Sequence, residues 1–153
     1  MANRLFISLL ATTVLAAPAA AQERQWSLDA SGEDAYLVFG VPDSDDIGVS
    51  IWCPIQQGEV HVYLPETAEN LGDGQKTAMT ISTDDMSINV EAALDAGQDG
   101  GTSSVEATLP DDSPIFDSML KADRFTIKVG SDETVFPLFE ADLSGLMDLC
   151  RKN

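Results

Sequence analysis

Histidine, cysteine and positive charge are scarce in this 153-residue chain, and each scarcity excludes a class of function. The single histidine, His61, lies between two valines, and no G-x-S-x-G nucleophile motif accompanies it, so a hydrolase triad has no second member. Eight lysine and arginine residues oppose 26 aspartate and glutamate residues. Because nucleic-acid binding needs cations that replace the counterions of phosphate groups, we exclude nucleic acid as a partner.

Charge is also missing from Leu5–Ala16, an apolar run that follows Arg4. The run leads into small residues in an A-x-A pattern, which is the order of a secretory signal peptide. It is too short to cross a bilayer, which needs about 20 apolar residues. We therefore predict a signal peptide over residues 1–21, cleavage between Ala21 and Gln22, and a periplasmic or secreted protein without membrane insertion after cleavage.

The predicted mature chain, residues 22–153, has the usual size of one domain. Its seven basic and 26 acidic residues give a net charge of −19, which favours solubility. The acidity is concentrated in residues 22–120, whereas residues 121–153 are nearly neutral. This pattern suits a solvated acidic surface, and it also offers sites to a cationic partner or to metal ions.

Only two cysteines exist, Cys53 and Cys150, and both follow the predicted cleavage site. Exported proteins meet an oxidising compartment in which cysteines pair. The spacing is not C-x-x-C, and two cysteines with one histidine cannot complete a zinc site without carboxylates. We predict a structural disulfide, which closes a long loop and by the chain-entropy model contributes about 4 to 5 kcal/mol.

Alternation of apolar and polar residues is the strongest structural pattern in the chain. It runs through Ile47–Cys53 and, after a turn, through Glu59–Leu64, which predicts a hairpin. The core face of this hairpin comprises Val49, Ile51, Cys53, Val60, Val62 and Leu64. Further strands are expected over residues 35–41, 77–82, 86–92, 104–109, 125–129 and 134–138.

Two short helices interrupt the strands. The first is capped by Asp112 or Ser113, has Pro114 in its first turn, and presents an apolar face of Ile115, Phe116, Met119 and Leu120. The second is indicated by helical spacing of Phe139, Leu143, Leu146, Met147 and Cys150. The predicted fold is therefore mainly β with two short helices, an antiparallel sandwich or barrel whose C-terminal helix is stapled to a strand by the disulfide.

Three residues on the other face of the hairpin, Trp52, His61 and Tyr63, are the candidate ligand or partner face. Large aromatic side chains are usually buried, so we expect Trp26, the N-terminal strand or a helix to cover them. If the face is uncovered, it can bind a ligand or a partner protein.

Two oxygen-rich segments are candidates for calcium binding. Asp43, Asp45 and Asp46 precede Gly48, and a second segment spans residues 95–101. Neither has the spacing of an EF-hand loop, and aspartate and glycine also form ordinary turns. We assign no metal site, no cofactor and no catalytic residue.

Several segments resemble small exported bacterial proteins of the invasion-associated locus B type. The matching pieces are Trp52-Cys53, the spacing of Phe116, Leu120, Phe125 and Ile127, and Val135-Phe136-Pro137-Leu138 running into the helix that ends at Cys150. The resemblance implies a periplasmic or secreted β-rich domain without established catalytic residues. This chain differs from that family in having only two cysteines and a large negative charge.

The favoured hypothesis is a non-enzymatic periplasmic or secreted binding or accessory protein, whose partner is a protein or a small ligand. One alternative is a hydrolase or inhibitor-like factor that acts on envelope polymers through surface carboxylates. Another is an acidic calcium-binding protein.

Overall fold

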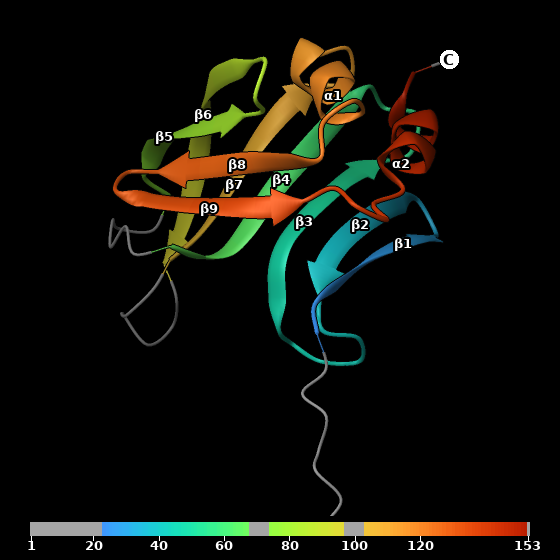
Figure 1. Ribbon diagram of the computed structural model, residues 1–153, viewed down its shortest axis with the longest axis horizontal. Helices are drawn as coiled ribbons and strands as arrows, with labels where there is room; N and C mark the ends of the chain where they lie inside the picture. Colours follow the sequence, from blue (N-terminus) through green and yellow to red (C-terminus); the bar gives the residue numbers. More distant parts are fainter. Residues whose placement is uncertain (1–22, 68–73, 97–102, 153) are drawn as a thin grey trace, which may run out of the picture.

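The computed structural model describes residues 23–67, 74–96 and 103–152, so the predicted signal peptide and its cleavage site lie outside the described residues. Nine strands form one antiparallel sheet, and two helices accompany it (Figure 1). The strands are β1 (Gln25–Ser31), β2 (Asp34–Gly40), β3 (Ile47–Pro54), β4 (Glu59–Thr67), β5 (Lys76–Ser82), β6 (Ser87–Ala96), β7 (Ser103–Pro110), β8 (Arg124–Val129) and β9 (Asp132–Pro137). The helices are α1 (Pro114–Met119) and α2 (Leu143–Cys150).

The sheet curls into a half-barrel, which confirms the predicted mainly β class and its antiparallel pairing. The strand order is β1-β2-β3-β4-β7-β6-β5-β8-β9, so β1 and β9 are the two edge strands. Yet the Trp26 indole Nε1 of β1 donates to the Pro137 carbonyl of β9 at 2.6 Å. The Trp26 ring also lies 6.4 Å from the Phe125 ring of β8. The curl therefore brings the two ends of the sheet within side-chain reach.

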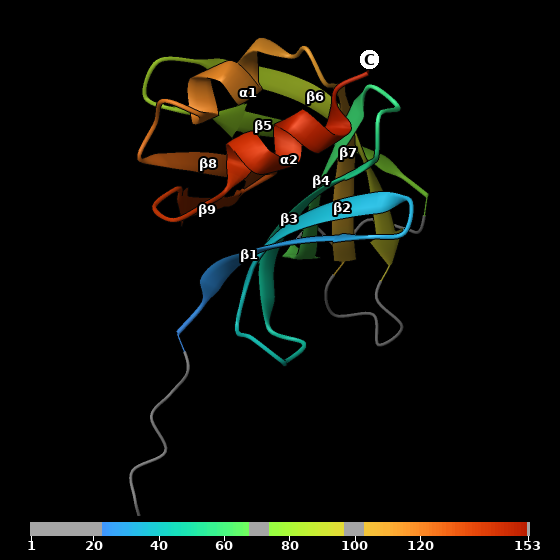
Figure 2. The ribbon, with the colours of Figure 1, turned by 90° about the vertical axis from the view of Figure 1, so that its right-hand side faces the viewer.

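The concave side of the half-barrel holds the hydrophobic core, and both helices lie at one end of it (Figures 1 and 2). The two helices contribute Phe116 and Leu146, which are at most 1 % exposed, to the same cluster as the inward side chains of the strands. Removing a buried phenylalanine side chain costs about 3 to 5 kcal/mol. Packing against both helices therefore fixes which face of the sheet is internal.

The β3–β4 hairpin is formed as the alternation predicts. All six residues predicted for its core face are buried, with exposed fractions of 6 % or less. The register pairs Ile51 with Val62 and Trp52 with His61. Because successive side chains of a strand point to opposite faces, Trp52 and His61 must lie on the convex side, which we call the outer face.

The predicted disulfide between Cys53 and Cys150 is present, and both cysteines are fully buried. It joins β3 to α2, and the neighbouring backbone strengthens the link. The β3–β4 turn donates from Gln56 N to the Leu149 carbonyl at 3.0 Å and from Gly58 N to the Cys150 carbonyl at 3.3 Å. Gly58 has a φ of +80°, which glycine adopts without strain.

Three details differ from the sequence prediction. β1 was not among the predicted strand ranges, although Trp26 and Leu28 alternate with polar residues and pack on the core. Phe139 is not on the helix but is 78 % exposed, because Glu140 has a φ of +60° and α2 begins only after its N-cap Asp142. Leu120 ends α1 as its C-cap and is 41 % exposed.

No helix among the described residues is both long enough and apolar enough to span a membrane.

Candidate functional site

The outer face is not covered as we expected. Trp26 packs against Phe39 and Phe125 on the core side, β1 extends the sheet beside β2, and both helices insert into the core cluster. Within the described part of the chain, the ring and polar contacts of Trp52 and His61 all come from strands of the sheet itself. The Trp52 ring stacks on the His61 ring and on the Tyr36 ring, all three from strands of the sheet.

A row of stacked rings runs across three neighbouring strands on this face. The Trp52 and His61 ring centroids lie 4.0 Å apart with an interplanar angle of 14°, and the Tyr36 ring of β2 stacks on the other side of Trp52 at 5.7 Å. The register creates the row, because Tyr36 pairs with Trp52 and Trp52 pairs with His61. Such cross-strand aromatic pairs contribute about 0.5 to 1.5 kcal/mol each beyond area burial.

Tyr63, the third residue of the predicted face, lies on the same side of β4 but outside this row. It pairs with Ser50 of β3 and Glu106 of β7, and no ring contact joins it to Trp52 or His61 among the described residues. The structure therefore brings Trp52 and His61 together and adds Tyr36, while Tyr63 borders the group.

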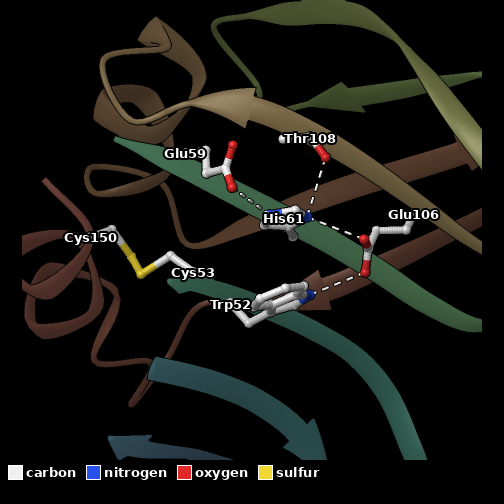
Figure 3. A network of polar contacts seen from close by, with 7 residues as sticks. All are labelled: Trp52, Cys53, Glu59, His61, Glu106, Thr108 and Cys150. Carbon is white, nitrogen blue, oxygen red and sulfur yellow. Dashed lines mark hydrogen bonds and ion pairs between the residues drawn. A yellow bond between two sulfur atoms is a disulfide. The ribbon is translucent and has the colours of Figure 1, made fainter. Parts of the chain in front are cut away.

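Glu106 of β7 joins the two rings through hydrogen bonds (Figure 3). Its Oε2 accepts from the Trp52 indole Nε1 at 3.1 Å, and its Oε1 lies 3.1 Å from His61 Nδ1. Both carboxylate oxygens are thus occupied by neighbouring side chains. Hydrogen bonds to an ionised group are stronger than neutral ones, so Glu106 fixes the orientation of both rings.

The two nitrogens of His61 have different surroundings. A carboxylate can only accept, so we infer that Nδ1 carries a proton and donates to Glu106, with the Thr108 hydroxyl 3.2 Å from the same nitrogen. Nε2 is buried and has no hydrogen-bond partner among the described residues, although Glu59 Oε1 lies 3.6 Å away. The His61 ring therefore lies between two carboxylates.

This arrangement is not that of a nucleophile and base. In a hydrolase triad, the nucleophile and the orienting carboxylate bind opposite nitrogens of the imidazole. Here Thr108 and Glu106 both approach Nδ1, and the other nitrogen is buried. The His61 side chain itself is only 13 % exposed. The group is thus organised as a rigid surface, with its polar atoms used to hold one another.

Carboxylates surround the ring row. Asp34 Oδ2 accepts from the Tyr36 hydroxyl at 3.3 Å, Glu59 lies beside His61 Nε2, and Glu106 joins the two central rings. Partial desolvation, the Asp34 charge and this hydrogen bond raise the pKa of Tyr36 above its ordinary value. No lysine or arginine among the described residues forms an ion pair with any of the three carboxylates.

A hollow of about 510 Å³ adjoins the row on the outer face. Glu106 and Thr108 form one side of it, Ala93 is part of its lining, and Glu91 with its ion-pair partner Lys76 forms another side. The small side chain of Ala93 leaves space beside the taller Glu106. Glu106 lines the hollow and is also hydrogen-bonded to the Trp52 and His61 rings, so the hollow and the ring row form one continuous surface.

The segments considered for calcium do not form a metal cluster in the described part of the chain, where no three histidine, cysteine, aspartate or glutamate side chains are grouped suitably. The aspartates before Gly48 belong to the β2–β3 turn, in which Val41 N donates to the Asp46 carbonyl at 2.9 Å. The Asp46 carboxylate accepts from Arg24 Nε, also at 2.9 Å. Residues 97–101 of the second segment lie outside the described residues.

Sequence reasoning missed five members of the group: Asp34, Tyr36, Glu59, Glu106 and Thr108. Alternation alone places each of them on the outer face, because their strand neighbours Ala35, Val60 and Ala107 are buried. Alternation does not reveal that β4 pairs with β7, because the β5–β6 hairpin separates these two strands in the sequence. That pairing brings Glu106 next to His61.

A scan against protein-family models finds no match for the chain, and searches of curated proteins and of solved structures find no significant match. The resemblance to exported proteins of the invasion-associated locus B type therefore stays a prediction.

Proposed function

We propose that this chain is an exported, non-enzymatic binding or accessory protein, and that the outer face recognises a ligand bearing an ammonium or guanidinium group. The observation that supports this most directly is the set of three carboxylates, Asp34, Glu59 and Glu106, around the row of stacked rings. Carboxylates and aromatic rings are the groups that bind organic cations. The rigid pairing of these groups lowers the entropy cost of binding.

Export and the disulfide belong to the same proposal. An apolar leader followed by an A-x-A pattern addresses the chain to the periplasm or the exterior, and a buried disulfide suits an oxidising compartment. The resemblance to invasion-associated locus B proteins points to the same location. The large negative charge favours encounter with cationic partners over polyanions.

Calorimetric titration with argininamide tests this proposal, with N-acetylglutamate as the anionic control. We expect argininamide to bind and N-acetylglutamate not to bind. Glu59→Gln and Asp34→Asn should each weaken binding about two- to fivefold, because a solvent-exposed ion pair contributes up to about 1 kcal/mol. Asp148→Asn removes a charge from the exposed side of α2 and should leave the affinity unchanged.

Two outcomes contradict the proposal. Absence of heat with argininamide, or equal affinity in Glu59→Gln, Asp34→Asn and the wild type, removes the assigned ligand class. Turnover in a screen of envelope polymers that is lost in Glu106→Gln supports the hydrolase alternative instead.

A further inference from the structure

A second surface lies where the two ends of the curled sheet approach each other. Two hollows of about 500 and 170 Å³ lie between β9 and the facing parts of β3 and β4, and they share Leu64, Glu66 and Thr134. We call this continuous groove the β9 seam. It is on the opposite side of the sheet from the stacked rings, because Leu64 belongs to the buried core.

One wall of the seam is the outer edge of β9, which pairs with β8 on one side and has no ladder partner on the other side among the described residues. The β8–β9 hairpin has a two-residue turn, Gly130-Ser131, between the paired residues Val129 and Asp132. The pair that flanks such a turn is hydrogen-bonded, and the pairs then alternate. The N–H and C=O groups of Glu133 and Val135 therefore point away from β8. The carbonyl of Pro137, next in this series, does accept from Trp26 across the seam.

The side chains around the seam are apolar at its base and acidic at its rim. Leu64, Ile127 and Val129 line the base, whereas Glu66, Asp132 and Glu133 line the rim. Among the described residues, Arg24 is the only base that lines the groove, and its guanidinium is held by Asp46. Lys128 pairs with Glu133 in the register on the outer side of the hairpin, without an ion pair between them among the described residues.

Val135 adds an apolar contact on the outer side of the same edge. It is 54 % exposed, although it lies within a strand. An extended chain added beside β9 would alternate its side chains, so one set would enter the groove toward Leu64 and Ile127 and the other set would pass Val135 and Glu133.

We propose that the β9 seam binds an extended, basic segment of a partner protein by β-strand addition, independently of the ligand assigned to the outer face. Exposed sheet edges bind extended peptides through main-chain hydrogen bonds, and pockets for alternate side chains supply the specificity. The segment that fits this seam alternates β-branched apolar residues with lysine or arginine. The apolar set fills the base of the groove, and the basic set lies along the Val135 side of the strand and pairs with Glu133.

A second copy of this chain fits the seam less well. Both molecules would have a strongly negative charge, and two copies of β9 placed edge to edge would bring the carboxylates of Asp132 and Glu133 into one interface. Like charges that face each other across a sheet destabilise the pairing.

The test uses the mature protein and a blocked octapeptide of alternating valine and lysine, with the valine–glutamate octapeptide as the charge control. We expect the basic peptide to bind, the acidic peptide not to bind, and salt to weaken the binding. In hydrogen exchange, the basic peptide should slow the Val135 amide at least tenfold. Val135→Pro removes this N–H without removing a bond to β8, so it should weaken binding at least tenfold.

Val135→Thr keeps the N–H group and serves as the matched control, with affinity within about twofold of the wild type. If Val135→Pro alters the near-ultraviolet circular dichroism, the Glu66→Lys and Glu133→Lys variants replace it, and each should also weaken binding. Asp148→Asn, a change on the exposed side of α2 and outside both proposed surfaces, should leave the affinity unchanged.

Several results would overturn this proposal. They are no binding of the basic peptide, equal binding by Val135→Pro and the wild type, and an affinity that depends on Glu59 rather than on Val135. A concentration-dependent dimer that Val135→Pro abolishes would assign the edge to self-association instead.

Discussion

Replacing Glu106 by alanine should destabilise the protein far more than replacing an exposed glutamate. The carboxylate of Glu106 accepts from both the Trp52 indole and His61 Nδ1, each at 3.1 Å. Alanine leaves the Trp52 indole N–H without this acceptor and leaves His61 Nδ1 with only the Thr108 hydroxyl, 3.2 Å away. A buried donor that loses its partner costs about 1 to 3 kcal/mol, whereas an exposed ion pair contributes about 0 to 1 kcal/mol.

The magnitude follows from the burial of the two donors. His61 has only 13 % of its side chain exposed, so water can replace the lost bond only partly, and Trp52 is half-buried. Taking the lower end of the range for each donor, we expect a loss of about 2 kcal/mol. With a urea m value of about 2 kcal/mol/M, the unfolding midpoint should fall by about 1 M.

Urea unfolding of the oxidised protein measures this loss. Glu91→Ala is the control because Glu91 is 65 % exposed and, within the described part of the chain, forms an ion pair with Lys76 alone. A cycle with Trp52→Phe isolates one bond, since Glu106→Ala should cost about 1 kcal/mol less when the indole N–H is already absent. If Glu106→Ala costs no more than Glu91→Ala, or if the cycle shows no coupling, the hydrogen-bonded group described above is wrong.

Three further predictions concern the disulfide, the tyrosine and the seam. Cys53→Ala/Cys150→Ala should lower the free energy of unfolding by about 2 to 5 kcal/mol in chemical denaturation, and a smaller loss than 1 kcal/mol would contradict the role given to the bond. In an absorbance titration of the two tyrosines, the pKa of Tyr36 should lie above its ordinary value, and Asp34→Asn should lower this pKa. Because the folded pKa is raised, the stability that Tyr36 contributes is complete below its unfolded pKa and is lost as the pH rises through the folded pKa. Trp26→Phe removes the bond to Pro137 and should speed amide exchange across β9 with a loss of about 1 kcal/mol, so unchanged exchange would show that the indole does not hold the seam.

The sequence predicts those parts of the fold that depend on local alternation or helical spacing. Ile51 and Val62 alternate with polar neighbours, and both are buried as predicted. Cys150 lies on the apolar face of a short helix and Cys53 lies on the core face of β3, both as predicted. Because both side chains face the core, they can form the disulfide. The prediction was wrong at Phe139. This residue has helical spacing to Leu143, but it precedes Asp142, the N-cap at which the helix begins.

The candidate site depends on pairings between distant strands, which local patterns do not determine. Alternation places Trp52 and His61 on one face, but Glu106 reaches them only because β7 pairs with β4. The expectation that Trp26 would cover this face failed because Trp26 lies on the core side of β1 and bridges to β9. The covering of a face is a property of the whole curled sheet, so no segment of sequence indicates it.

The outer face as a cation-binding surface is tested most directly by the indole N–H signals of the two tryptophans in nuclear magnetic resonance spectra. Trp52 donates to Glu106 on the outer face, whereas Trp26 donates to Pro137 at the seam. During titration with argininamide, we expect the Trp52 signal, assigned by its absence in Trp52→Phe, to shift saturably while the Trp26 signal stays in place. A stationary Trp52 signal, or a shift of Trp26 alone, would contradict the assignment of the outer face as the binding surface.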